Sequence, residues 1–185
     1  PDELLLSEML QSNNYKTGIF GKWHLGDAEK FMPTNHGFDE FYGILFSNDM
    51  WPFHPERPQD YPNDLMLYKN DKPVQALIDQ SDLTKNITDE SIRFIEENKN
   101  NQFFLYIAHP QPHVPLFASK EFQGSTGEGL FADVISEIDF SVGRVIEALE
   151  KNNLSENTIV VFTSDNGPWL SHGDHAGSSG IFREG

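Results

Sequence analysis

The segment TIVVFTSDNGP, residues 158–168, places an apolar run directly before a polar turn. The first six residues are mostly β-branched or aromatic, which favours a β-strand, and we therefore predict a strand over 158–163. The DNGP that follows strongly favours a turn. Asp165 and Asn166 then have two interpretations: they belong to an ordinary turn, or they form part of a ligand site at the end of a sheet.

The rest of the chain alternates between helix and strand patterns. Apolar residues recur at three- and four-residue spacing over 3–13, 81–99 and 130–151, which predicts three helices. Residues 15–20 and the continuous apolar run 103–108 predict two more strands. This alternation indicates an α/β fold of three layers, α/β/α, in which a largely parallel sheet lies between helices.

Two connecting segments have no helix or strand pattern. Glycines bracket residues 21–26, where we expect a loop. Residues 27–75 are rich in Pro, Asn, Asp and aromatic residues and show no sustained period, so we expect a long irregular excursion.

Composition narrows the class of protein. The 185 residues suit one domain, and 37% of them are hydrophobic, which is enough for a core. A formal net charge of −16 without a Lys/Arg cluster argues against nucleic acid as a partner. No apolar run approaches the roughly 18–20 residues of a membrane span. The absence of cysteine excludes disulfides, zinc thiolates and a thiol nucleophile within these residues. No pattern indicates an oligomeric state.

Polar side chains follow each of the three expected strands. In an open α/β sheet, ligands bind outside the carboxyl ends of the strands, so we expect these side chains to converge. In strand order they are Lys22 and His24, then His109 and His113, then Asp165 and Asn166.

Asp165, Asn166 and Lys22 each have a functional and a structural interpretation. The oxygens of Asp165 and Asn166 suit Ca²⁺ or Mg²⁺ better than zinc, but two ligands are too few for a complete shell. Taken alone, this segment is more often a turn. Lys22 could neutralise an oxyanion, whereas a lone Lys-Trp pair is more often a surface lysine beside a core tryptophan.

The histidines also have functional and structural interpretations. His113 lies between prolines in a stiff segment that suits a preorganised proton donor or a turn cap. His24 lies two residues after Lys22 and would project to a similar side. For His109, directly after a buried strand, we expect a structural hydrogen bond. His172 and His175 lie in a glycine-rich segment where we expect solvent exposure.

Four stretches together resemble the sulfatase family of the alkaline phosphatase-like superfamily, with the character of arylsulfatases and galactosamine-6-sulfatase-like enzymes. They are TGIFGKWHLG at 17–26, NHGFDEFYG at 35–43, HVPLFASKEF at 113–122 and IVVFTSDNGP at 159–168. The resemblance spans nearly the whole chain. It implies an alkaline phosphatase-like fold, of which residues 1–185 form a single partial catalytic domain, and a periplasmic, secreted or lysosomal location.

The resemblance also implies roles for individual residues in sulfate ester hydrolysis. Lys22 matches the lysine that contacts the sulfate and the catalytic aldehyde, and His24 matches the histidine beside that aldehyde. His113 matches the histidine that protonates the leaving alcohol. Ser47, in FSND, is similar to a polar residue that some members place near the site. The implied partner is a small-molecule or glycan sulfate ester.

The resemblance implies two cofactors. Asp165 and Asn166 match ligands of the family's calcium ion, with Mg²⁺ as the less favoured occupant. The family's nucleophile is a formylglycine made from Cys or Ser in a C/S-x-P-x-R motif, and this chain has no such motif. We therefore expect an internal fragment that lacks the nucleophile segment and the C-terminal part, or a truncated inactive relative. By itself the fragment should have no turnover.

Two other functions share these features. A phosphodiesterase or phosphonate hydrolase of the same superfamily would use a similar oxygen-rich metal site. A non-catalytic relative that binds sulfated glycans would not need the nucleophile. The GKWHLG segment favours the sulfatase interpretation.

Overall fold

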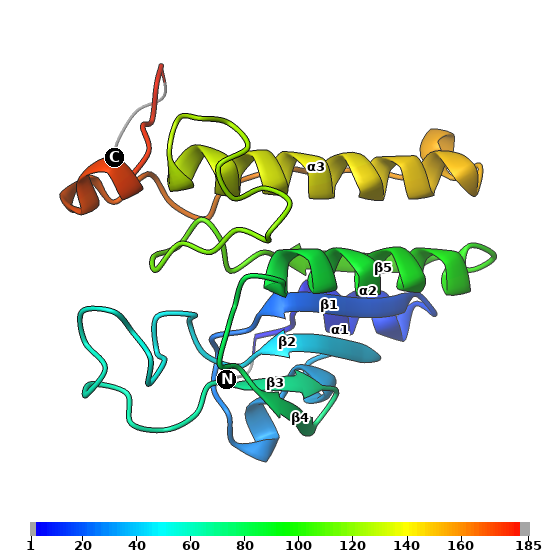
Figure 1. Ribbon diagram of the computed structural model, residues 1–185. Coiled ribbons are helices and arrows are strands. Elements are labelled where there is room, and N and C mark those ends of the chain that lie inside the picture. The colour runs from blue at the N-terminus through cyan, green and yellow to red at the C-terminus, as the bar shows by residue number, and fades with distance from the viewer. Residues whose placement is uncertain (1–2, 182–185) are drawn as a thin grey trace.

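The computed structural model describes residues 3–181, and within this range five strands form one sheet in the order β4-β3-β2-β1-β5 (Figure 1). The strands are β1 (Lys16–Lys22), β2 (Glu40–Ile44), β3 (Met66–Lys69), β4 (Lys72–Ala76) and β5 (Phe103–Ala108). β1 runs parallel to both β2 and β5, whereas β3 and β4 extend the sheet in antiparallel fashion beyond β2. The expected α/β fold with a mostly parallel sheet is confirmed.

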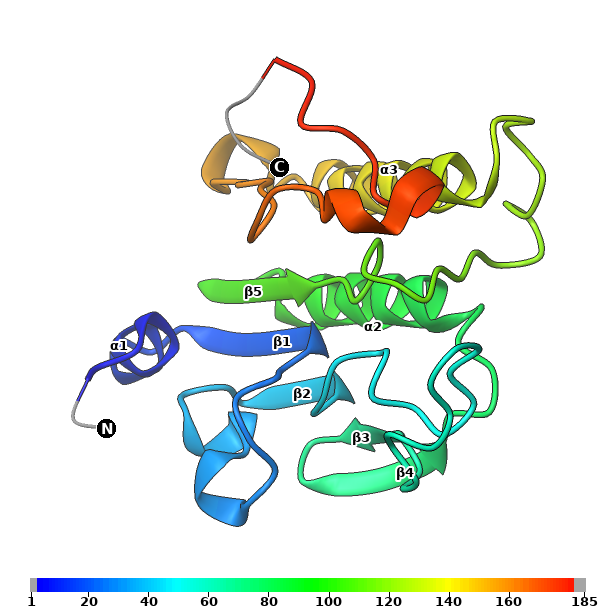
Figure 2. The same ribbon diagram turned by 90° about the vertical axis from the view of Figure 1, so that its left-hand side faces the viewer.

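Helices lie mainly on one face of this sheet. In the described range they are α1 (Leu6–Ser12), α2 (Leu83–Asn98) and α3 (Leu130–Lys151), with short 3₁₀ turns η1 (Glu29–Phe31), η2 (Pro33–Asn35), η3 (Ser155–Asn157) and η4 (Leu170–His175). α2 packs on the sheet and α3 packs on α2 (Figures 1 and 2). None of these helices is long and apolar enough to cross a membrane.

The core has two halves because side chains alternate along β1. Phe20 packs edge-on against Phe94 of α2, with ring centroids 5.7 Å apart, and both are about 1% exposed. Ile19 points to the other face, where it packs with Phe38 and Phe41 under the η1–η2 segment. Each fully buried side chain of this size contributes about 1.5–3 kcal/mol to stability. Burial on both faces therefore fixes β1 as the centre of the sheet.

The predicted strand over 158–163 is wrong. The segment has no regular secondary structure and passes behind α3 in Figure 1, and the Ile159, Val161 and Phe162 side chains are 93%, 79% and 74% exposed. Strand propensity in such a run is expressed only when a neighbouring strand supplies the hydrogen bonds. Among residues 3–181, β5 ends the sheet on one side and pairs only with β1, so 158–163 has no ladder partner.

The irregular excursion predicted for 27–75 is correct only for its middle. Residues 45–65 contain no helix or strand, but β2, β3 and most of β4 lie in the remainder. These strands have four or five residues, and β4 is almost entirely exposed, so no alternation of apolar and polar residues marks them. The loop predicted for 21–26 also begins too early, because β1 continues to Lys22.

Gly21 allows the three parallel strands to approach closely where they end. It pairs with Gly43 on β2 and Ala108 on β5, and a Cβ at Gly21 would lie 1.9 Å from the Ala108 carbonyl oxygen. A Cβ at Gly43 would lie 1.8 Å from the Gly21 oxygen. Gly21 also has φ of +127°, in a region that favours glycine. The three strands can therefore approach this closely only because positions 21 and 43 are glycines.

We predict that Gly21→Ala lowers the free energy of unfolding by about 2–4 kcal/mol, because the methyl group forces β1 and β5 apart. Gly143→Ala is the matched control, since a Cβ there meets nothing within 4 Å and the position is helical. That change should raise stability by about 0.5–1 kcal/mol. Urea unfolding followed by circular dichroism measures both, and similar effects of the two changes would contradict the argument.

Candidate functional site

The carboxyl ends of β1, β2 and β5 form the candidate site. These adjacent strands end level with one another, and Figure 2 shows their arrowheads at the same side of the molecule. Three polar segments leave the sheet there: Lys22 to His24 after β1, Ser47 to Asp49 after β2, and His109 to His113 after β5. The first and second predicted strands thus end side by side and β2 ends beside them, whereas the predicted third strand, 158–163, is not part of the sheet.

Lys22, His24 and His113 lie within electrostatic range of one another. Partial burial lowers the pKa of His24, and the nearby Lys22 ammonium and His113 lower it further, while Asp49 acts in the opposite direction. His24 is therefore held mainly neutral near pH 7. Lys22 and His113 both lie close enough to His24 to act on its charge, and such a gathering of basic groups at the sheet edge suits an anion.

Trp23 anchors the segment between Lys22 and His24. Its side chain is 8% exposed, and its indole Nε1 donates to the Phe31 carbonyl at 2.8 Å. The His24 amide donates to the Leu45 carbonyl at 3.0 Å and holds His24 in a left-handed conformation with φ of 56°. A residue other than glycine in this conformation is uncommon and depends on its surroundings for support. The lysine and histidine are thus presented from a fixed backbone.

His113 is oriented by its own loop. Its ring Nδ1 lies 2.6 Å from the Val114 carbonyl, which can only accept, so Nδ1 carries a proton. Nε2 is then an acceptor in the neutral ring and a donor only in the imidazolium. His113 can therefore act as a proton donor through Nε2 when it is charged.

Ser47 and Asn48 belong to the segment that follows β2 and lies at the candidate site. Ser47 is 3% exposed, and its hydroxyl has no hydrogen-bond partner among the described residues. Asn48 is fully buried and donates from Nδ2 to the carbonyls of His113 at 3.1 Å and Pro115 at 3.2 Å. The sequence analysis missed Asn48 because β2 itself was not predicted. The sequence indicated Asn48 only by its place beside Ser47 in FSND.

His109 has the structural role expected for it. Its Nε2 lies 3.1 Å from the Ser141 hydroxyl, which in turn lies 2.6 Å from the Thr88 hydroxyl. Burial lowers the pKa of His109 to about 4, and its Nδ1 is shielded from solvent with no partner in the described chain. The neutral ring ties the end of β5 to α2 and α3.

His172 and His175 lie in η4. His175 is exposed as expected, but His172 is half-buried against Trp169, with ring centroids 4.4 Å apart. The prediction of exposure is therefore wrong for His172, because the neighbouring indole covers it.

Asp165 and Asn166 lie in an exposed turn that follows the unpaired 158–163 segment. The hydrogen bonds of this turn are local: Ser164 Oγ donates to the Asn166 carbonyl, and Asn166 Nδ2 donates to the Gly167 carbonyl, both at 2.7 Å. Their oxygens suit a hard cation in type, but no group of three or more His, Asp or Glu residues within 3–181 is arranged to hold a metal. Their assignment as calcium ligands stays a prediction.

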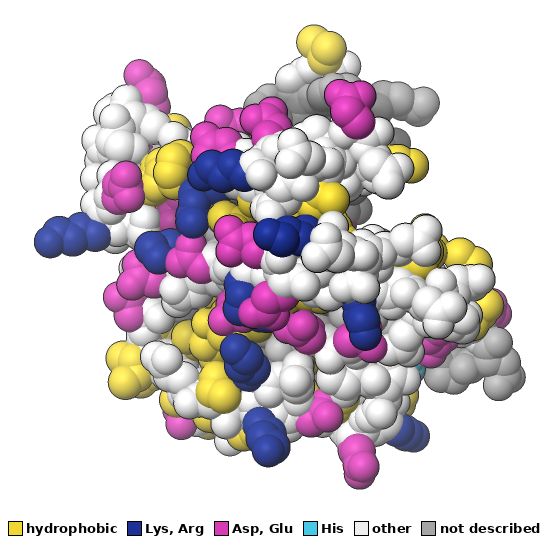
Figure 3. All heavy atoms as spheres, turned by 90° about the vertical axis from the view of Figure 1, so that its right-hand side faces the viewer, with side chains coloured by type: hydrophobic (Ala, Val, Ile, Leu, Met, Phe, Trp, Pro, Cys, Tyr) yellow, Lys and Arg dark blue, Asp and Glu magenta, His cyan; other side chains and the backbone are white. Residues whose placement is uncertain are grey.

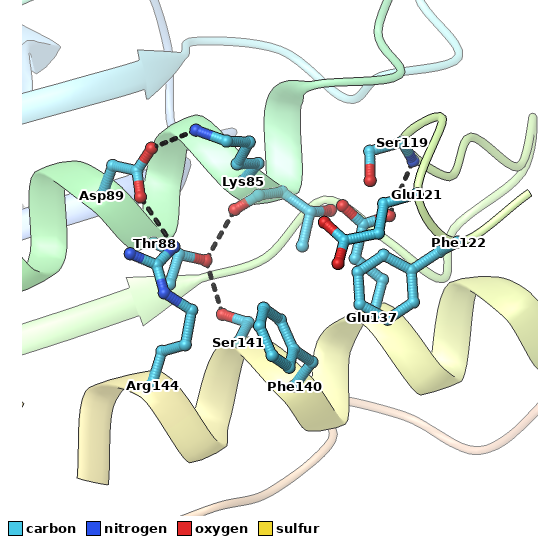
Figure 4. Close-up of a pocket in the computed structure, with 11 residues that line it drawn as sticks. Lys85, Thr88, Asp89, Ser119, Glu121, Phe122, Glu137, Phe140, Ser141 and Arg144 are labelled. Atoms are coloured by element: carbon cyan, nitrogen blue, oxygen red, sulfur yellow. Dashed lines mark hydrogen bonds and ion pairs between the residues drawn. The ribbon is translucent and has the colours of Figure 1, made fainter. Parts of the chain in front are cut away.

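A separate hollow of about 260 Å³ lies between α2 and α3 (Figure 4). Four of its five charged side chains have protein partners within 3–181, and Glu121 is the exception: Asp89 accepts from Lys85 at 2.5 Å and Arg144 at 2.7 Å, and Glu137 accepts from the Ser119 amide at 2.8 Å. Burial raises the pKa of Glu137. Because these groups satisfy one another, the hollow is better explained by helix packing than by ligand binding.

The arginines of residues 3–181, and some of the lysines, are paired with carboxylates. Figure 3 shows acidic and basic groups interleaved on the face opposite to that seen in Figure 2. Arg93, for example, contacts Glu40, Glu90 and Glu97 at 2.5–2.9 Å. Several lysines, Lys120 among them, have no carboxylate of residues 3–181 within ion-pair distance, and Lys22 is such a lysine at the end of β1. Its charge remains free to act on a ligand.

Comparison with known proteins identifies the family of the chain. The family model described as Sulfatase matches residues 1–184. This chain belongs to the sulfatase family. Among its relatives, an arylsulfatase of Hemicentrotus pulcherrimus is 36% identical over 193 residues, which cover 99% of this chain and 35% of that protein. The N-acetylgalactosamine-6-sulfatase of Homo sapiens is 36% identical over 194 residues, which cover 98% of this chain and 36% of that protein.

Solved sulfatase structures share the fold. The PsFucS1 sulfatase from Pseudoalteromonas sp. aligns with a TM-score of 0.78 at 25% identity, covering 91% of this chain and 39% of that one. Ps i-CgsB in complex with k-i-k-neocarrahexaose aligns with a TM-score of 0.76 at 32% identity, covering 96% and 43%. This sulfatase chain therefore spans about a third of the length of the curated relatives it matches.

We predict that His109→Gln makes the chain less sensitive to acid. The folded-state pKa of His109 is about 4, against 6.5 for the unfolded residue, so its contribution to stability is present above pH 6.5 and is lost as the pH falls through about 4. The loss amounts to at most about 3 kcal/mol. Urea midpoints at pH 7 and pH 4 should therefore differ less in the variant than in the wild type.

The exposed His175→Gln variant serves as the control and should keep the wild-type dependence on pH. If His109→Gln lost stability toward acid as steeply as this control, burial of a neutral His109 would not be the cause.

Proposed function

We propose that the full-length protein containing this chain hydrolyses sulfate esters, and that Lys22, His24 and His113 act on the ester. The observation that supports this most directly is their clustering at one sheet edge in a chain of net charge −16. A sulfate monoester is an anion, and it would be drawn to a region in which a lysine and two imidazoles gather. Membership of the sulfatase family and the names of its relatives agree with this.

The chemistry of each side chain follows from its surroundings. The Lys22 ammonium neutralises sulfate oxygens as charge develops during cleavage of the ester. His113, as imidazolium, donates its Nε2 proton to the departing alcohol oxygen, so the leaving group departs as a neutral alcohol. His24 is kept neutral by burial and by its cationic neighbours, and therefore suits the acceptance of a proton in the same cycle. The Ser47 hydroxyl is buried, so the predicted contact of Ser47 with the substrate requires this hydroxyl to be exposed in the full-length protein.

The nucleophile has to come from another part of the protein. The family's formylglycine derives from Cys or Ser in a motif that this sequence lacks, so the residues of this chain do not fit that group. The part of the reaction that falls to these residues is binding of the anion and transfer of protons. It follows that the 185 residues alone should show no turnover.

Replacement of His113 should separate good from poor leaving groups. In the full-length protein, His113→Ala should slow hydrolysis of aryl sulfates with weakly acidic phenols by about 10²–10⁴-fold, because the departing oxygen then lacks its proton donor. Strongly acidic phenols leave without help and should be affected little. Lys22→Ala should slow all of these substrates by about 10²–10³-fold, because charge neutralisation does not depend on the phenol.

The measurement is kcat/KM across a series of phenyl sulfates, with the exposed Lys120→Ala as control. Phosphate diesters and phosphonates are tested beside them. Faster turnover of those esters by the wild type would favour the phosphodiesterase alternative over sulfate hydrolysis.

Calcium binding is a further part of this proposal. Asp165 and Asn166 offer a carboxylate and an amide oxygen, which suit Ca²⁺, and a bound Ca²⁺ would supply positive charge for the sulfate oxygens. The outer edge of β5 has no partner within 3–181. We infer that in the full-length protein the apolar run 158–163 pairs into a sheet extended past this edge, which would bring both residues to the candidate site.

Calcium should raise the melting temperature of the full-length protein, and chelation should reverse this. Asp165→Ala should abolish the calcium-dependent shift, because one of the charged ligands is lost. Asp174→Ala, in the neighbouring η4 turn, should retain it. Scanning fluorimetry with Ca²⁺, Mg²⁺ and EDTA measures the effect. An undiminished shift in the Asp165 variant would exclude that residue as a ligand.

A further inference from the structure

We propose that Asn48 is a positioning residue that fixes His113 against the β1 and β2 exits. The proposal rests on the proposed sulfate ester hydrolysis. Asn48 is 0% exposed, and its single side-chain amide nitrogen bonds two carbonyls of the loop that follows β5. The segment after β2 is also bonded to the segment after β1, because the His24 amide donates to the Leu45 carbonyl. One neutral side chain thus joins two of the segments that form the site.

The contacts of Asn48 surround the residue whose carbonyl orients the His113 ring. Asn48 Nδ2 bonds the carbonyls of His113 and Pro115, while the carbonyl of the intervening Val114 accepts from His113 Nδ1. Three consecutive carbonyls are therefore engaged in one network. A shift of the backbone at 113–115 would rotate the imidazole along with it.

The loop 110–115 cannot be held in place by the backbone hydrogen bonds of a helix or strand. Pro110, Pro112 and Pro115 each lack an amide proton, so the segment can join neither a helix nor a central strand. Gln111 supplies an internal connection by donating to the Pro115 carbonyl and accepting from the Phe117 amide, both at 3.2 Å. That connection stiffens the loop internally. Asn48 attaches the stiffened loop to the rest of the sheet edge.

Asn48 is itself held from α2. Gln80, which is 2% exposed, donates from Nε2 to the Asn48 carbonyl at 2.9 Å, and the Gln80 carbonyl accepts from the Leu83 amide at the start of α2. The position of Asn48 is therefore tied to the helix that packs on β1. Loss of its side chain should release the loop as a stiff unit, not unfold it.

Loss of the Asn48 side chain should affect some sulfate esters more than others. A displaced His113 transfers its proton poorly, so only esters that require this proton should suffer. Asn48→Ala in the full-length protein should lower kcat/KM by about 10²-fold for aryl sulfates with weakly acidic phenols, as expected for a displacement near 1 Å. Strongly acidic phenols should lose less than about threefold. The plot of log kcat/KM against phenol pKa should become steeper.

Asn98→Ala is the matched control. Asn98 is another buried amide, 8% exposed, and it donates to a backbone carbonyl, that of Phe94, at 2.9 Å within α2. It should reduce the melting temperature without changing the slope. Asn48→Asp is the second variant, because it fills the same volume but presents at most one proton to the two carbonyls. It should show a defect of the same selectivity even if Asn48→Ala folds poorly.

Each outcome has a defined meaning. A steeper slope for the Asn48 variants and an unchanged slope for Asn98→Ala support the proposal. A loss that is equal for all phenols, or a slope like that of Asn98→Ala, overturns it while leaving the proposed function intact. If the wild type hydrolyses no sulfate ester, the proposed function fails and this proposal fails with it.

Discussion

The parallel pairing of β1 between β2 and β5 is the constraint on which the site depends. Because Gly21 and Gly43 have no side chains, the three strands can approach closely at the level where they end. Their exits then leave the sheet from one place, and Lys22, His24 and His113 meet although up to ninety residues separate them in the sequence. No long-range ion pair is needed to gather these groups, since backbone hydrogen bonds and the core under β1 do so.

The charge distribution of the molecule gives this edge its chemical character. Acidic residues far outnumber basic ones, and cations such as Arg93 and Arg144 are paired with carboxylates along α2 and α3. Lys22 has no carboxylate partner among residues 3–181, and it lies where β1 ends. Burial lowers the pKa of His24 most, and the Lys22 ammonium lowers it further, so the group that would bind an anion also favours a proton acceptor beside it.

Sequence patterns predicted those parts of the fold that local periodicity decides. The apolar stripes of α2 and α3 and the continuous run of β5 specified these elements, and the rule that ligands bind at strand ends brought together Lys22, His24 and His113. Sequence patterns gave wrong predictions where the presence of a neighbouring strand decides whether a segment becomes a strand. Residues 158–163 have higher strand propensity than 40–44 or 72–76, yet only the latter have neighbours to pair with. Asn48 was missed for a related reason, because a buried amide is recognisable only when the carbonyls that it serves are known.

Neutral amides order this site for a physical reason. A loop with three prolines has more carbonyl acceptors than amide donors, so side chains must supply the missing protons. A buried lysine or arginine could do so, but its desolvation would be costly and its charge would compete with Lys22 for the substrate anion. Asn48, Gln111 and Gln80 donate without adding charge. The charges that act at the sheet edge are then those of Lys22, Asp49 and the histidines, while the amides determine where His113 lies among them.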